Sequence, residues 1–138
     1  MSEHLNPAIA IDPFNQQPVV TDPELHITLM SGPHDGQIHG FKPISQFEPL
    51  IITIGRRIGC HIVLDYDAQV SRVHARLIYD PRDAEYFLED AESRNGTFVG
   101  QTRLRARIRL EPGTMFRIGR TWLRLDPISD PLNEKSTE

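Results

Sequence analysis

QVSRVHARLIY, residues 69–79, combines two different patterns. From residue 73 onward apolar and polar side chains alternate, which is the period of two of a half-buried β-strand. The apolar members of this alternation are Val73, Ala75, Leu77 and Tyr79. Just before it, where a loop runs into the strand, the chain carries a hydroxyl, a guanidinium and an imidazole: Ser71, Arg72 and His74. The stretch therefore predicts a strand with polar groups gathered at its beginning.

Short β-like segments of this kind recur along most of the chain, separated by Gly, Pro, Asn and Asp. They are LHITLM (25–30), LIITI (50–54), HIVLDY (61–66), EYFLED (85–90), TFVG (97–100), RIRL (107–110), TMFRIG (114–119) and TWLRLD (121–126). No apolar stripe with helical spacing runs for the ~11–18 residues that indicate a helix. The pattern predicts an all-β sandwich or barrel. Only GQIHGFKPISQFEP (36–49) is expected to be a long irregular connection.

Length and composition indicate one domain with a tail at each end. The chain has 138 residues, of which 38% are hydrophobic and 25% charged. These values are typical of a single soluble domain with a hydrophobic core. The ends are rich in Pro, Asn, Gln and Asp and show no sustained period. We expect flexible tails at 1–24 and 127–138, with the domain at 25–126.

Several features predict a cytoplasmic protein. No apolar run approaches the ~18–20 residues of a bilayer-spanning helix, and the N-terminus lacks the pattern of a secretory signal. Cys60 is the only cysteine, which excludes an internal disulfide and favours a reducing compartment. The net charge of -4 argues against a general nucleic-acid binder, which is usually basic. We therefore expect no membrane and no nucleic acid among its partners.

TIGRR (53–57) places a glycine and two arginines where an apolar segment ends. Gly55 would let the backbone turn sharply and hold Arg56 at the base of a loop. A guanidinium held there can bind an oxyanion through two parallel hydrogen bonds. The alternative is a glycine at a strand end followed by two solvated arginines, Arg56 and Arg57, since surface arginines are common.

Ser71 and His74 could form a nucleophile and its base, or they could be structural. On a continuous strand these two residues would point to opposite faces, so they would not readily hydrogen-bond. The serine also lacks the GxSxG context of a nucleophile elbow. A loop serine bonded to its own backbone and a buried, satisfied histidine are the plain alternative. We therefore predict that the protein is not an enzyme and that no residue is catalytic.

ESRNGTF (92–98) carries Asn95-Gly96 between two β-like segments. This dipeptide is a strong signal for a hairpin or tight turn, which is a sufficient structural explanation. The side chain of Asn95 would still be free at the loop tip, and its amide offers both a donor and an acceptor to one peptide unit. The six histidines show no paired zinc spacing, and nucleotide-binding motifs are missing. We expect no metal, no cofactor and no small-molecule substrate.

In this order the motifs resemble the forkhead-associated (FHA) domain. That family has a Gly-Arg turn, then Ser-x-x-His about fifteen residues on, then Asn-Gly about twenty further. Here they are Gly55-Arg56, SRVH at 71–74 and NGT at 95–97. LMSGPHDG, CHIVL and LEPGTMFRIGRTWLRL also look like the family, so the resemblance covers about residues 25–126.

The resemblance implies a sandwich of two twisted, mostly antiparallel sheets, with about eleven strands and with loops at one end that bind phosphothreonine peptides. Arg56 and Ser71 would bind the phosphate, with Arg72 contacting the phosphate or the peptide backbone. Asn95 would hydrogen-bond the peptide backbone just after the phosphothreonine. Gly55, His74, Gly96 and Thr97 would be structural. Arg94 stands where the family commonly has a small hydroxyl residue, so it would either lose or add a ligand contact. His61 stands where Asp is frequent, which we expect to affect only the surface.

Two functions remain open. The favoured one is a phosphothreonine-binding adaptor or regulator in Ser/Thr-kinase signalling, in a bacterium by analogy, whose partner is a kinase or its substrate. The alternative is a phospho-independent assembly module that docks partners on a sandwich face. VVTDPE (19–24) also makes Thr21 a candidate phosphosite, because it is the only threonine before the domain. A plain linker threonine is the alternative. The tether to the domain is too short for binding in cis, so a phosphorylated Thr21 would act between molecules.

Overall fold

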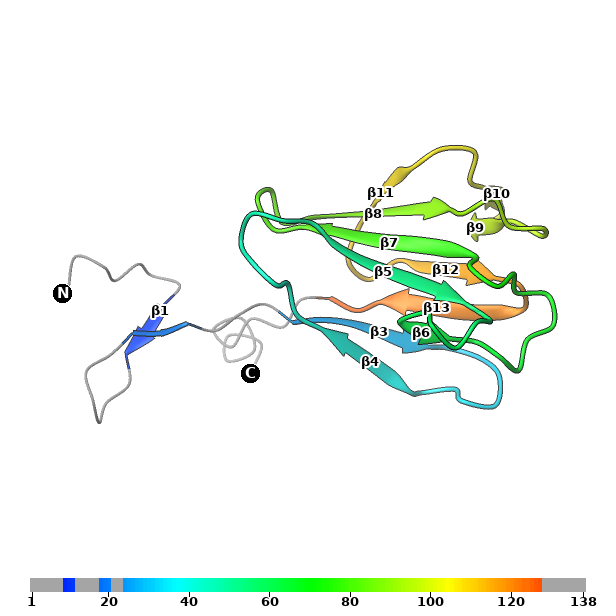
Figure 1. Cartoon of the computed structure of the whole chain (residues 1–138), viewed down its shortest axis with the longest axis horizontal. Helices are drawn as coiled ribbons and strands as arrows, with labels where there is room; N and C mark the ends of the chain where they lie inside the picture. Colours follow the sequence, from blue (N-terminus) through cyan, green and yellow to red (C-terminus); the bar gives the residue numbers. More distant parts are fainter. Residues whose placement is uncertain (1–8, 12–17, 21–23, 128–138) are drawn as a thin grey trace.

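The computed structural model describes residues 9–11, 18–20 and 24–127. Within this part every regular element is a β-strand, and none of it forms a helix of the length and apolarity that crossing a membrane requires. Eleven strands build two sheets that face each other, as Figure 1 shows. A separate two-stranded sheet, β1 (Ile9–Ile11) with β2 (Pro18–Val20), precedes them. The predicted all-β sandwich is confirmed.

The larger sheet has six strands and is antiparallel throughout. Its order is β10 (Thr102–Arg103), β9 (Thr97–Val99), β12 (Met115–Ile118), β13 (Thr121–Leu125), β3 (Leu25–Leu29) and β4 (Ile38–Phe41). The smaller sheet has the order β11 (Ile108–Leu110), β8 (Glu85–Asp90), β7 (Ala75–Asp80), β5 (Leu50–Gly55) and β6 (Ile62–Val63). Only the β5–β6 pair is parallel.

The core lies between the two sheets and is built from alternate residues of each strand. The side chains that are completely buried include Phe116, Ile118, Ile27, Ile52, Ile54, Leu77, Leu88 and Leu123. Burying a side chain of this size contributes about 1.5–3 kcal/mol. This rigid core fixes where the strands end, and the loops at those ends carry the candidate site.

The loops that carry the candidate site leave the sandwich at one end. The β3–β4, β5–β6, β6–β7 and β8–β9 connections and the β12–β13 turn all lie on the right in Figure 1. Strand β3 begins, and β13 ends, at the opposite end. Segments far apart in the sequence therefore meet at a single surface.

Two expectations about local structure were wrong. The connection 36–49 is not wholly irregular, because residues 38–41 form β4 at the edge of the larger sheet. EYFLED and TFVG do not form a hairpin, since β8 and β9 belong to different sheets and the Asn95-Gly96 loop crosses between them. The predicted tails lie largely outside the described residues, so the domain boundaries at 25 and 126 stay predictions. Thr21 also lies outside the described residues.

Candidate functional site

The β5–β6 and β6–β7 loops are joined through their backbones beside Gly55. The backbone N–H groups of Arg56 and Arg57 donate to the carbonyls of Ser71 (3.0 Å) and Arg72 (3.1 Å). A Cβ on Gly55 would collide with the Arg72 carbonyl. The φ of Gly55 is not in the left-handed region, so our expectation of a turn that needs glycine's freedom was wrong. Glycine is required here because the backbone at the end of β5 and the backbone of the β6–β7 loop approach each other closely.

Arg56 is exposed, yet its side chain is fixed at one point. Its Nε donates to the carbonyl of Val70 at 2.9 Å. The two terminal nitrogens of the guanidinium have no hydrogen-bond partner among the described residues. This arrangement holds the planar group while leaving its outer edge available for a bidentate interaction with an anion.

His74 connects two of the loops from a completely buried position. The N–H of Ser71 donates to Nδ1 at 2.9 Å, so Nδ1 is an acceptor and the ring proton lies on Nε2. Nε2 therefore donates to the carbonyl of Gly96, 2.8 Å away. Burial lowers the pKa of His74, although the Gly96 carbonyl and the carboxylates of Asp90 and Asp67 oppose this. The neutral imidazole thus bridges the β6–β7 and β8–β9 loops.

Ser71 and His74 are not on a continuous strand, because β7 begins at Ala75. The assumption that they point to opposite faces was therefore wrong, and the backbone of Ser71 does contact the imidazole. The hydroxyl takes part in a different bond, since Ser71 Oγ accepts from the N–H of Arg94 at 3.0 Å. Both ring nitrogens are already engaged with backbone groups. The pair therefore lacks the contact between hydroxyl and base that a nucleophile needs.

Asp90, at the end of β8, organises the loop 91–96. Its carboxylate accepts from the N–H (2.9 Å) and Oγ (2.6 Å) of Ser93 and from Thr97 Oγ1 (2.7 Å). Burial raises the pKa of Asp90, but these hydrogen bonds outweigh it and hold the pKa below its ordinary value. Ser93 Oγ accepts in turn from the N–H of Gly96 at 2.8 Å. Sequence reasoning missed Asp90 and Ser93, although Asp-x-x-Ser after a strand is a signal for such a turn.

This loop presents three exposed side chains, those of Glu92, Arg94 and Asn95. Asn95 Nδ2 donates to the carbonyl of Gln69 at 2.9 Å, which leaves the amide oxygen and one amide hydrogen for a ligand. Gly96 has a φ of 90°, a conformation that favours glycine. Thr97 is completely buried. The structure thus brings together, at one end, all the loops that carry the predicted site residues.

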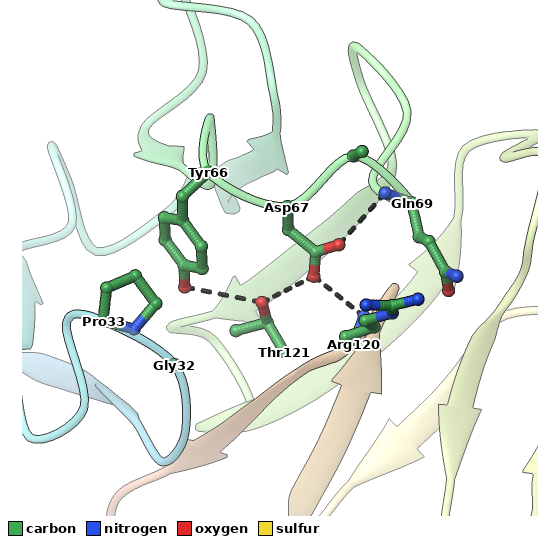
Figure 2. Close-up of a pocket in the computed structure, with 8 residues that line it drawn as sticks. Gly32, Pro33, Tyr66, Asp67, Gln69, Arg120 and Thr121 are labelled. Atoms are coloured by element: carbon green, nitrogen blue, oxygen red, sulfur yellow. Dashed lines mark hydrogen bonds between the residues drawn. The ribbon is translucent and has the colours of Figure 1, made fainter.

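A cleft of about 440 Å³ lies next to these loops. It is lined by Gly32, Pro33, Tyr66, Asp67, Ala68, Gln69, Arg120 and Thr121. Figure 2 shows the carboxylate of Asp67 at its centre, accepting from Thr121 Oγ1 (2.8 Å) and from the N–H groups of Arg120 (2.8 Å) and Gln69 (3.0 Å). These bonds join the β6–β7 loop to the β12–β13 turn. Sequence reasoning missed the cleft, since its walls are distant in the chain.

The arginines are distributed unevenly over the molecule. Those at the loop end have no carboxylate within 4.0 Å among the described residues; they are Arg56, Arg57, Arg72, Arg94, Arg103 and Arg120. Five arginines on the sheets and at the other end are paired with carboxylates; they are Arg76, Arg82, Arg107, Arg109 and Arg124. Two more have no carboxylate within 4.0 Å among the described residues: Arg117 on β12, which stacks on Phe98, and Arg105, which is exposed after β10. The loop end therefore presents guanidinium groups that no carboxylate of the described residues neutralises by direct contact, on a chain of net charge -4. Within residues 24–127 no cluster of three or more potential metal ligands occurs.

A β-sandwich that presents arginine and asparagine side chains from loops at one end has the donor groups that an anionic ligand requires. Residues 52–119 match the family model of the FHA domain. The chain belongs to this family, whose members are binding modules rather than catalysts.

Relatives and solved structures agree with this assignment. FhaB of Mycobacterium tuberculosis is 33% identical over 93 residues, which are 67% of this chain and 57% of FhaB. The chain therefore matches little more than half the length of this relative. The FHA domain of an Arabidopsis thaliana hypothetical protein is 26% identical with a TM-score of 0.67, over 80% of this chain and 90% of that one. EmbR of M. tuberculosis, solved with a low-affinity phosphopeptide, shares the fold (TM-score 0.64, 23% identity, 85% of this chain and 27% of EmbR).

Proposed function

We propose that this chain is a non-catalytic phosphothreonine-peptide-binding module that acts as an adaptor or regulator in Ser/Thr-kinase signalling. The observation that carries the proposal is the set of arginines without carboxylate partners at the loop end, around the immobilised guanidinium of Arg56. A phosphothreonine brings a charge of about -1.5 to -2 and three acceptor oxygens to this surface.

Three residues would hold the phosphate. Arg56 offers the outer edge of its guanidinium, Ser71 offers its hydroxyl proton, and Arg72 adds a third exposed donor group from the same loop. The Ser71 hydroxyl is suited to this because its oxygen already accepts from the Arg94 N–H, which orients it. Each charge-assisted hydrogen bond contributes about 1.5–3 kcal/mol, equivalent to roughly 10–150-fold in affinity.

The peptide backbone would be held by the β8–β9 loop. Asn95 supplies an amide donor and acceptor for the peptide unit after the phosphothreonine, and Arg94 adds a contact from the same tip. Gly55, His74, Gly96 and Thr97 support these groups without contacting the ligand. The cleft beside Gln69 is open next to Asn95, so it would take a side chain that follows the phosphothreonine.

The expected partners are proteins that carry phosphothreonine, either a Ser/Thr kinase itself or a substrate of one, in the cytoplasm. The phosphopeptide complex of EmbR supports a phosphorylated ligand for this fold. No cofactor takes part.

The test is fluorescence-anisotropy binding of a degenerate phosphothreonine peptide library to the full chain. Phosphoserine and unphosphorylated libraries are the ligand controls. Arg56→Ala should abolish measurable binding, whereas Arg82→Ala, which removes an exposed arginine paired with Asp80 at the other end, should not. Binding that is independent of phosphate, or unchanged in Arg56→Ala, would refute the proposal and favour assembly through a sandwich face.

A further inference from the structure

We propose that Arg103 recognises an acidic side chain that precedes the phosphothreonine in the ligand by two or three residues. This inference rests on the proposed function and adds a specificity-determining residue to the same site. Arg103 lies outside the motifs that identify the family, and it reaches the site only through the fold.

The structure places the guanidinium of Arg103 directly against the binding loop. Its Nε and Cζ lie 2.6 and 3.0 Å from the position that a Cβ on Gly96 would occupy. Because Gly96 has no side chain, the arginine packs over its backbone, next to Asn95. The absence of a side chain at this position thus makes room for a cation as well as allowing the positive φ.

Arg103 has no ion-pair partner among the described residues. It is exposed and has no carboxylate within 4.0 Å. On β9, the neighbouring strand, Phe98 lies opposite it in register. The ring of Phe98 already stacks with Arg117, whose guanidinium lies 4.3 Å from the ring centroid. A second cation, Arg94, is exposed in the same loop, and Glu92, the exposed carboxylate of this loop, makes no ion pair with Arg103 among the described residues, so Arg103 stays available to a ligand carboxylate.

The distance to the phosphate site fits a nearby residue of the same peptide. The Ser71 hydroxyl lies 3.0 Å from the Arg94 nitrogen, and two residues of chain from there to Gly96 span at most about 7 Å. Gly96, against which the guanidinium of Arg103 packs, therefore lies within about 10 Å of the Ser71 hydroxyl. An extended peptide covers this distance in about three residues.

The direction in which the peptide runs across the loop end follows from the order of the strands. The cleft lies at the β12–β13 turn and the β3–β4 loop, whereas β10 is the far edge strand of the same sheet. Three strand spacings separate β10 from β13, about 14 Å. A peptide whose later residues run toward the cleft must therefore send its earlier residues toward Arg103.

The experiment compares two phosphothreonine peptides that differ only in Glu or Gln at the second and third positions before the phosphothreonine. The full chain should bind the Glu peptide about two- to fivefold more tightly at low salt, the range of an exposed ion pair, and added salt should reduce this preference. Arg103→Gln should remove the preference while keeping the affinity for the Gln peptide. Arg105→Gln, the same charge change at an exposed arginine two residues further, should retain it.

A preference that persists in Arg103→Gln would overturn the inference. Equal weakening of both peptides in Arg103→Gln would also overturn it, because Arg103 would then act only through a general field. If the folded wild-type chain binds neither peptide, the proposed function itself fails, and this outcome is distinct from the other two.

Discussion

Replacing His74 by alanine should destabilise the fold by about 3 kcal/mol. The substitution removes the acceptor of the Ser71 N–H and the donor to the Gly96 carbonyl. Leaving a buried polar group without a partner costs about 1–3 kcal/mol. Gly96 is buried and should incur this cost in full, whereas Ser71 is only half-buried and water can replace part of its bond. The lost packing of a completely buried ring adds to this.

Urea denaturation followed by tryptophan fluorescence measures this loss. For an m-value of about 2 kcal/mol/M, the midpoint should fall by roughly 1.5 M. His26→Ala is the matched control, because that imidazole is partly exposed and makes a long contact of 3.7 Å with the exposed carboxylate of Glu24; we expect a change below about 0.5 kcal/mol. A loss below about 1 kcal/mol in His74→Ala would refute the reasoning that the imidazole holds the two loops together.

Three further outcomes are expected. The folded-state pKa of His74 lies below its ordinary value of 6.5, so the unfolded chain takes up the proton at a higher pH than the folded chain. The free energy of unfolding should therefore fall as the pH drops below about 6.5. Urea titrations of His74→Ala at several pH values should lack this dependence. The lowered pKa of Asp90 adds a loss in the same direction at lower pH, as the carboxylate becomes protonated. Gly55→Ala should lower the free energy of unfolding by about 1–3 kcal/mol, because the new Cβ would force the β6–β7 loop away from the end of β5. Gly59→Ala, where a Cβ meets no atom within 4 Å, should leave the free energy of unfolding nearly unchanged in the same urea titration. A chain phosphorylated at Thr21 should associate in a concentration-dependent manner in sedimentation experiments, because β3 begins at the end opposite to the loops; masking of the site that does not depend on concentration would contradict this.

The strands with regular alternation could be predicted from the sequence because one of their faces is buried. β5, β7 and β8 show this pattern in their buried positions. β4 was missed because it is an edge strand whose four residues are all at least partly exposed, and it contains Gly40, which is unfavourable in a strand. β10 has only two residues, both exposed. Such strands are specified by pairing with a neighbour and not by their own composition.

The site was predictable where a motif marks it and not where the fold alone creates it. Order and spacing single out Gly55, Arg56, Ser71, His74 and Asn95, and the structure brings the loops that carry them together at one end. Their hydrogen-bond partners could not be predicted, because backbone carbonyls such as those of Val70 and Gly96 have no sequence signature. Asp67 and Arg120 are far apart in the chain, and only the two loops that they stabilise bring them together.

The unusual Arg94 illustrates how the architecture of the loop and the chemistry of the ligand are separable. The loop is held by Asp90, Ser93 and the Gly96 backbone, and Arg94 contributes to it only through its N–H group, which donates to Ser71. Any residue except proline supplies that N–H. The side chain is exposed and has no structural partner among the described residues. A change from a small hydroxyl residue to arginine at this position therefore alters the charge that the loop exposes, while the backbone hydrogen bonds that hold the loop stay the same.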